Sequence, residues 1–147
     1  YERFVDERDF ESLVRNYFEQ YLGQFPAQVF DKINENFIRC SFFELVSRYL
    51  SSCYTFAIEQ NNSEGRADFE MTGIPGTDYY TDDRLVEFKY YKAKEAEKML
   101  GLDAPLPEHV EQVHRYAEDT LRHFPNYKVR TYVVYICANR GWKCWEV

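Results

Sequence analysis

Long apolar runs are absent from this sequence of 147 residues. It contains no stretch of eighteen apolar residues, no charged segment followed by an apolar stretch of the signal-peptide type, and no internal repeat or low-complexity tract. We therefore expect a cytoplasmic protein without a membrane partner. Because the sequence begins with Tyr1 and not with Met, we also expect it to be excised from a longer protein or trimmed to its ordered part.

Cysteine and histidine are scarce. The four cysteines include no Cys-x-x-Cys pair, and no histidine stands near them at zinc-finger spacing, which argues against a structural zinc site. We expect reduced thiols in a cytosolic core, since free cysteine is among the residue types most often buried. The three histidines, His109, His114 and His123, lie on or near one predicted helix, where we expect them to be solvated.

Positive charge is also scarce. The chain has 18 Lys and Arg residues against 25 Asp and Glu residues, for a formal net charge of -7 at pH 7. Neutralisation of phosphates by Lys and Arg supplies most non-specific affinity for nucleic acid, so this balance argues against a domain that holds DNA by itself. What the sequence does contain is 45% hydrophobic and 18% aromatic residues, which is typical of one globular domain with a real core.

Helical periodicity and strand alternation divide the chain into a helical leader and an α/β core. We expect helices within 1–31, 34–52, 92–100 and 108–124, and strands at 54–59, 67–72, 84–91, 129–137 and 142–147. The first two strands are predicted to form a hairpin around the polar turn 60–65. Strand 129–137 is almost continuously apolar, as a central strand buried on both faces would be. We assign 1–33 to a leader or a linker from a preceding domain, and 34–147 to the core.

Three residues of the predicted strands suit phosphodiester hydrolysis. Glu87 and Lys89 are two residues apart and project to one side of their strand, and an antiparallel neighbour could bring Asp68 to the same place. Two carboxylates can hold Mg²⁺, which keeps several waters, and a positioned lysine can orient the attacking water and offset charge at the phosphorus. The alternative is an ordinary surface pair of Glu87 with Lys89, with Asp68 as a turn cap.

Three short motifs follow one another along the chain. They are Gly65-Arg66-Ala67-Asp68, Val86-Glu87-Phe88-Lys89 and, in the next helix, Gln112-x-x-x-Tyr116. From about Asn34 to Val147 the chain resembles the PD-(D/E)XK nuclease superfamily, and most of all the RecB-related nuclease-like domains that follow AAA-ATPase-like domains. The resemblance implies a restriction-endonuclease-like α/β core with a mixed central β-sheet flanked by helices, in the order α-β-β-β-α-β, behind an N-terminal helical segment.

The resemblance also implies roles for individual residues. Asp68 and Glu87 would be the ligands of Mg²⁺ or Mn²⁺, and Lys89 would be the catalytic lysine. Glu35, at the start of the first core helix, would assist catalysis, with Glu44 as its competitor for that role.

Further candidates stand beside this cluster. Gln112 and Tyr116 share one helix face because they are four residues apart, so both are candidates for contacts with a nucleic-acid backbone or with the catalytic lysine. Their alternative role is ordinary packing of a polar residue and a half-buried ring. Arg66 is a candidate phosphate contact, and its alternative is a weak salt bridge to Glu64 or Glu70.

The function that these observations predict is a Mg²⁺-dependent nuclease acting on DNA, or on RNA, within a larger protein that has an ATPase-like domain in the same chain. The chain departs from the family at Asp78, Asp82 and Asp83, which add negative charge to the turn where a phosphate polymer would approach. The rival interpretation is a catalytically inactive nuclease-fold domain whose leader docks a partner or a second copy in a homo-oligomer. A hydrolase of a smaller phosphoester is the third.

Overall fold

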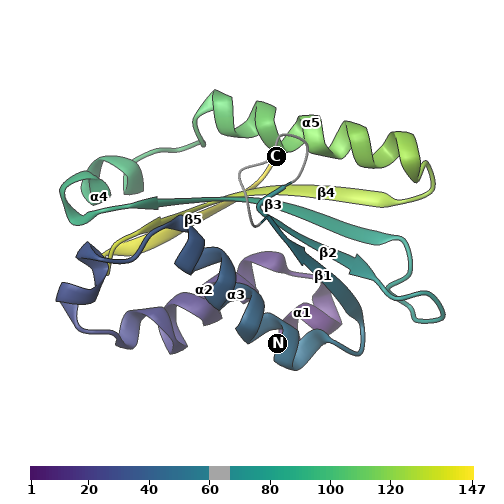
Figure 1. Cartoon of the computed structure of the whole chain (residues 1–147), viewed down its shortest axis with the longest axis horizontal. Helices are drawn as coiled ribbons and strands as arrows, with labels where there is room; N and C mark the ends of the chain where they lie inside the picture. Colours follow the sequence, from purple (N-terminus) through teal and green to yellow (C-terminus); the bar gives the residue numbers. More distant parts are fainter. Residues whose placement is uncertain (60–66) are drawn as a thin grey trace.

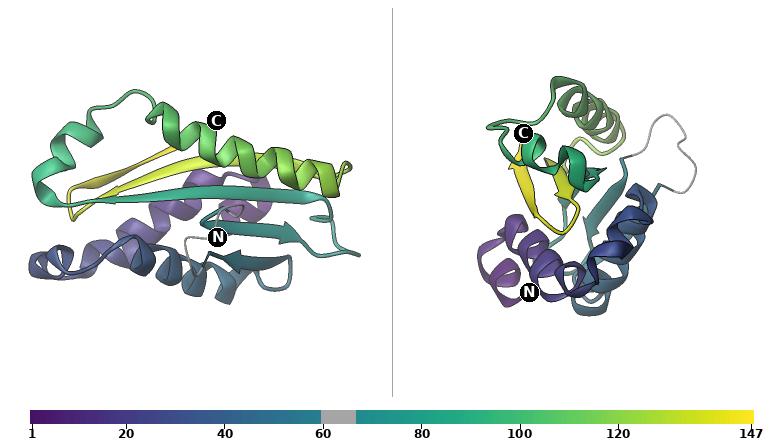
Figure 2. Two further views of the ribbon diagram at one scale, coloured as in Figure 1. Left: turned by 45° about the horizontal axis from the view of Figure 1, so that its top comes forward. Right: turned by 90° about the vertical axis from the view of Figure 1, so that its left-hand side faces the viewer.

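A computed structural model describes residues 1–59 and 67–147 and shows a five-stranded sheet between two layers of helices (Figure 1). The strands are β1 (Tyr54–Ile58), β2 (Phe69–Gly73), β3 (Asp82–Tyr91), β4 (Lys128–Cys137) and β5 (Gly141–Glu146). The helices are α1 (Glu2–Glu7), α2 (Phe10–Gln20), α3 (Glu35–Leu50), α4 (Ala93–Leu100) and α5 (Pro107–His123), with short 3₁₀ turns η1 (Leu22–Gln24) and η2 (Ala27–Asp31). Helices α1 to α3 cover one face of the sheet, and α4 and α5 cover the other (Figure 2).

The sheet is mixed, with the strand order β1-β2-β3-β4-β5. Strands β3 and β4 run parallel from Asp82↔Lys128 to Tyr91↔Cys137, whereas the other neighbours are antiparallel. The connection between β3 and β4 carries α4 and α5 across one face, as a parallel pair requires. The predicted α/β class, the mixed sheet and the order of its elements are therefore confirmed.

Local signals account for most element boundaries. Helix α3 begins after Asn34, whose Oδ1 accepts a hydrogen bond from the Phe37 N–H at 3.0 Å. Strand β2 begins two residues later than the sequence predicts, at Phe69, and leaves Asp68 just ahead of the strand. The predicted turn 60–65 lies outside the described residues, but the predicted antiparallel pairing of β1 with β2 is confirmed.

Each face of the sheet has its own apolar core. The core toward α1, α2 and α3 includes Phe42, Phe69 and Phe88, and the leader adds Phe4 and Phe10, which are 0% and 2% exposed. The smaller core under α4 and α5 is built from residues such as those at 85, 113, 133 and 135. The leader is thus packed on the sheet, while its assignment as a unit separate from residues 34–147 stays a prediction.

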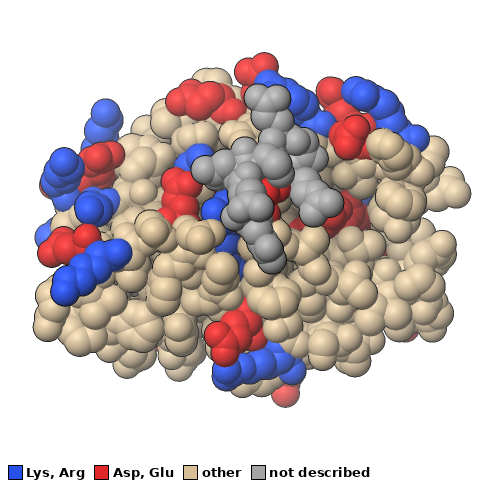
Figure 3. Space-filling view, viewed as in Figure 1, with Lys and Arg blue, Asp and Glu red and all other residues tan. Residues whose placement is uncertain are grey.

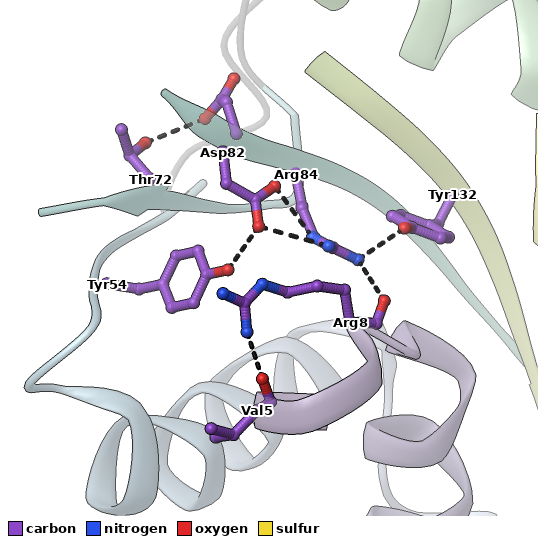
Figure 4. Close-up of polar contacts among 8 residues, drawn as sticks. Val5, Arg8, Tyr54, Thr72, Asp82, Arg84 and Tyr132 are labelled. Atoms are coloured by element: carbon purple, nitrogen blue, oxygen red, sulfur yellow. Dashed lines mark hydrogen bonds and ion pairs between the residues drawn. The ribbon is translucent and has the colours of Figure 1, made fainter. Parts of the chain in front are cut away.

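A buried arginine on β3 joins the leader to the sheet (Figure 4). Arg84 is 0% exposed, and its Nε and Nη2 lie 3.1 and 3.2 Å from the two carboxylate oxygens of Asp82. Its Nη1 donates to the Tyr132 hydroxyl at 2.8 Å and to the carbonyl oxygen of Arg8, the residue that ends α1, at 3.0 Å. The Tyr54 hydroxyl donates to the same Asp82 carboxylate. The end of α1 is therefore fixed over the middle of the sheet by a charged, hydrogen-bonded network.

The burial of the cysteines and the length of the helices test two further expectations from the sequence. All four cysteines are free, and Cys137 is buried in the core as predicted, whereas Cys40 is exposed on α3, so the prediction of core thiols is wrong for this residue. Among the described residues, no helix has the length and apolar character that crossing a membrane would require.

We predict that Arg84→Ala lowers the free energy of unfolding by about 3–5 kcal/mol, because it leaves the partly buried Asp82 carboxylate without its cation. Urea unfolding followed by circular dichroism measures the change. The matched control is Arg115→Ala, which removes an exposed ion pair with Glu111 and should change the free energy by less than about 1 kcal/mol. Equal effects of the two substitutions would contradict a central role of Arg84.

Candidate active site

The site begins where the pairing of β2 with β3 ends. The ladder's last pair is Phe69↔Val86, and β3 continues beyond it to Tyr91 while still paired with β4. We call the point where β2 stops pairing with β3 the fork. Here the Phe88 N–H, which lies past the end of the ladder, donates a hydrogen bond to Asp68 Oδ2 at 2.9 Å. Asp68 is 8% exposed, and its position is set by the sheet itself.

Arg39 neutralises this carboxylate from the opposite helix layer. It lies on α3, is 7% exposed, and its Nη1 contacts Asp68 Oδ1 at 2.8 Å, while its Nη2 donates to Asn36 Oδ1 at 2.8 Å. Sequence reasoning missed Arg39. The available signal was an arginine that stands directly beside Ile38 in the apolar stripe of the strongest predicted helix.

Glu87 is the most deeply buried acid of the cluster, at 1% exposure. Burial, and then the negative charge of Asp68, raise the pKa of the Glu87 carboxyl to about 8, although Lys89 opposes this change. Its Oε2 atom is buried and has no hydrogen-bond partner in the described part of the chain. A buried carboxylate oxygen without a donor indicates a position that a cation or a proton must satisfy.

Lys89 links the strand acids to α3. Its Nζ lies 3.4 Å from Glu87 Oε1 and 4.0 Å from Glu35 Oε2. Burial alone would lower the pKa of Lys89, but the carboxylates of Glu35, Glu87 and Asp68 outweigh it and raise the pKa above its ordinary value. The lysine is therefore a cation at neutral pH. The competing candidate, Glu44, instead forms an exposed pair with a residue one turn along α3.

The candidates of α5 lie half-buried and bond to each other. Gln112 Nε2 donates to the Tyr116 hydroxyl at 3.1 Å, which fits their spacing of one helical turn. Within residues 1–59 and 67–147, neither side chain forms a hydrogen bond to Asp68 or Glu87. Their predicted roles in catalysis and nucleic-acid binding stay predictions, and Arg66 lies outside the described residues.

A buried histidine also stands at the start of α5. His109 is 9% exposed and its Nδ1 lies 2.6 Å from the Tyr135 hydroxyl, which accepts the Leu106 N–H at 2.8 Å. Burial and then the positive charge of Lys89 lower the pKa of His109. The prediction that all three histidines are solvated is wrong for this one, because strand β4 supplies a partner that no local pattern reveals.

A third acid extends the row of carboxylates across the sheet. The Glu59 N–H donates to the Asp68 carbonyl oxygen at 3.1 Å, which continues the β1–β2 ladder one step past Ile58. Continued in the same way, the β2–β3 register places Asp68 opposite Glu87. Glu59 therefore lies just past the end of β1, Asp68 just ahead of β2 and Glu87 on β3, and Glu59 is 6% exposed. Sequence reasoning missed it because the residue ends an otherwise ordinary strand.

The donor set fits a magnesium ion held by few protein ligands. Within the residues that the structure describes, no group of three or more His, Cys, Asp or Glu side chains is placed to hold a metal ion. Mg²⁺ commonly binds through one or two carboxylates and keeps several waters, so Asp68 with Glu87 is a sufficient pair. The unpartnered Glu87 Oε2 supplies an oxygen ligand that no other group satisfies in the described part.

Comparison with known proteins identifies a family for the chain. Residues 33–146 match the sequence model of the PD-(D/E)XK nuclease superfamily. The chain belongs to this superfamily. No curated protein matches the chain. The resemblance is thus confirmed for the superfamily, and the five-stranded mixed sheet with its flanking helices is the restriction-endonuclease-like fold expected of a PD-(D/E)XK domain.

This PD-(D/E)XK domain carries another buried acid on the same sheet face as Glu87. Asp83 is 0% exposed, and its Oδ1 accepts a hydrogen bond from the Thr72 hydroxyl at 2.9 Å. Burial and then the neighbouring Glu70 raise the pKa of Asp83 to about 8. Since Asp82 is paired with Arg84, two of the three acids predicted to repel a phosphate polymer present little charge to solvent.

The raised pKa of Asp83 predicts a pH-dependent stability of this PD-(D/E)XK domain. The carboxyl binds its proton more tightly in the folded state than in the unfolded chain, where its pKa is about 3.9. Its contribution to stability is therefore full below about pH 4 and is lost as the pH rises to about 8. Asp83→Asn removes this loss, so the variant should gain at least about 1 kcal/mol relative to wild type between pH 5 and pH 9.

Urea unfolding at pH 5, 7 and 9 measures this difference. Asp78→Asn is the matched control, because Asp78 is exposed in the turn before β3. Its difference from wild type should stay constant over the same range. A constant difference for Asp83→Asn as well would contradict the assigned protonation.

Proposed function

We propose that this domain hydrolyses phosphodiester bonds of DNA, or of RNA, with a bound Mg²⁺ or Mn²⁺. The observation that supports the proposal is the convergence of Asp68, Glu87 and Lys89 at the fork between β2 and β3. Membership of the PD-(D/E)XK nuclease superfamily supports the reaction class.

Each side chain has a role that follows from its surroundings. Asp68 and Glu87 would hold the ion, which supplies a Lewis acid that polarises the phosphate and lowers the pKa of water. Lys89 is a cation, so it would donate hydrogen bonds to the attacking water oxygen and to a phosphate oxygen. As the water oxygen bonds to phosphorus, the water would release a proton to solvent, the bond to the leaving oxygen would break, and that oxygen would take up a proton from solvent. Glu35 would orient the Lys89 ammonium from α3.

The charge of the surface bears on how nucleic acid would be held. On the face shown in Figure 3, Lys and Arg side chains stand next to Asp and Glu side chains, with uncharged surface between them. With a net charge of -7, the domain has little electrostatic attraction for a polyanion. We therefore propose that an ATPase-like domain of the same cytoplasmic protein, or a second copy of the chain, supplies affinity for the substrate.

One observation favours a second candidate, an inactive nuclease-fold domain that binds other proteins. Both oxygens of Asp68 already have partners, since Oδ1 contacts Arg39 and Oδ2 accepts the Phe88 N–H. Metal binding must compete with the Arg39 ion pair. The two candidates differ in whether the cluster binds a divalent ion at all.

Metal binding is the first prediction of the nuclease proposal. Calorimetric titration of Mn²⁺ and Mg²⁺ should show binding to the wild type and at least about tenfold weaker binding to Glu87→Gln, which keeps the shape of the side chain but removes the anionic ligand. Glu118→Gln, on the exposed face of α5, is the control and should bind as the wild type does. Equal binding by all three proteins would place any metal elsewhere.

Cleavage is the second prediction. Lys89→Ala should reduce cleavage of single- or double-stranded DNA or RNA by at least about 100-fold, the loss expected when a donor to the transition state is removed. Lys98→Ala removes a lysine from the last turn of α4 and should leave the rate unchanged. Circular dichroism checks that both variants fold. Cleavage by folded Lys89→Ala at the wild-type rate would exclude the proposed role.

A further inference from the structure

A cavity of about 420 Å³ lies on the same sheet face as the acids of the fork. Strands β1, β2 and β3 line one side with Thr55, Glu70 and Leu85, and the second half of α5 lines the other with Tyr116 and Asp119. A volume of this size is typical of pockets that bind small organic groups. The cavity is therefore large enough for a nucleobase.

Two nearly parallel aromatic rings also line this cavity. The rings of Phe124 and Tyr127 have centroids 4.6 Å apart and planes inclined by 10°, and both residues line the cavity. Phe124 is 51% exposed, so much of this large apolar side chain is open to solvent. An exposed ring of this kind is the platform on which unpaired bases stack in proteins that bind single strands.

The charged groups that line the cavity are acids, and they stand beside neutral Thr, Tyr and His side chains. Neither Lys nor Arg lines it within the described residues, whereas the carboxyl groups of Glu70 and Asp119 do. Such a lining disfavours a phosphate and favours a ligand that carries N–H donors.

The cavity adjoins the proposed catalytic cluster. Ala67 lines it and directly precedes Asp68, and Leu85 lines it and precedes Glu87 by two residues on the same face of β3. Two residues along a strand span about 7 Å. A phosphodiester at the acids would therefore place the base of a neighbouring nucleotide within reach of the cavity.

We propose that this cavity is a subsite for an unpaired nucleobase that bears an exocyclic amine, next to the scissile phosphodiester. The aromatic rings stack on the base, and Glu70 accepts a hydrogen bond from its amino group. The inference rests on the proposed nuclease function, which supplies the polynucleotide, and adds to it a requirement for a single-stranded or locally unpaired substrate.

Binding without cleavage tests the subsite. The oligonucleotides (dC)₈ and (dU)₈ differ at position 4 of each base, where cytosine has an amine and uracil an oxygen. Calorimetric titration in EDTA at low ionic strength should show at least about fivefold tighter binding of (dC)₈ to the wild type. Phe124→Ala should weaken binding of both oligonucleotides about tenfold through the loss of stacking. Glu70→Gln should abolish the preference for (dC)₈.

Two variants elsewhere serve as matched controls. Tyr49→Ala removes another exposed ring, which is 59% exposed and stacks on Tyr1 on the opposite side of the sheet. Glu44→Gln neutralises an exposed acid of α3. Both should bind the two oligonucleotides as the wild type does.

The outcomes separate this subsite from the nuclease proposal. If the wild type prefers (dC)₈ in a manner that depends on Phe124 and Glu70 but cleaves nothing with Mg²⁺ or Mn²⁺, the subsite stands and the nuclease proposal falls. If the wild type cleaves, but Phe124→Ala and Glu70→Gln match it in binding and base preference, the subsite is overturned. Binding of an arginine-rich octapeptide that depends on Phe124, with no binding of either oligonucleotide, would also overturn it in favour of a basic protein ligand.

Discussion

Strand β3 carries charged side chains into both halves of the interior, and the fold depends on a partner for each of them. Toward the leader, Arg84 is held by Asp82 and by neutral oxygens. Toward α5, Glu87 faces Lys89, and Asp83 retains a proton. An isolated charge in such surroundings would be unfavourable by several kcal/mol. The leader and α5 therefore do more than bury apolar side chains. They also exclude water from charged groups that already have partners on the sheet.

The catalytic cluster arises from the way in which one ladder ends. Beyond the Phe69↔Val86 pair, β3 loses its neighbour on one side, and the side chain of Asp68 takes the next backbone donor. The same gap admits the start of α3, which brings Arg39 and Glu35 to the acids. Side chains from β3, from α3 and from the bend just ahead of β2 therefore converge here.

The strands, helices and central acids were predictable because their signals are local. The alternation of Leu85, Glu87 and Lys89 determines which face each side chain occupies once a strand forms, and in the structure Lys89 Nζ lies 3.4 Å from Glu87 Oε1. The late start of β2 was less predictable, since it depends on the hydrogen bond from the Phe88 N–H to the Asp68 side chain. The roles in catalysis remain predictions, because position alone does not measure chemistry.

The residues that sequence reasoning missed have distant partners. Arg39 and Asp68 are 29 positions apart, and His109 and Tyr135 are 26 apart, so each pair meets only in the assembled fold. A periodic sequence pattern predicts which face of a helix or strand is buried, but not which residue packs against that face. The raised pKa of Asp83 was not predictable for the same reason, because it is caused by burial in the assembled fold.

The parallel ladder of β3 and β4 has a consequence for how the protein folds. Its ten pairs join residues 46 positions apart, such as Asp82 with Lys128, so a long loop must close before any of its bonds form. The antiparallel β1-β2-β3 segment needs no such closure, and it contains Asp68 and Glu87. The two acids can thus meet early, in water, where both are ionised and repel each other only weakly. The two acids lose contact with water only when β4 and α5 pack onto the sheet, which is a later step. The acids therefore come together before burial changes their pKa values.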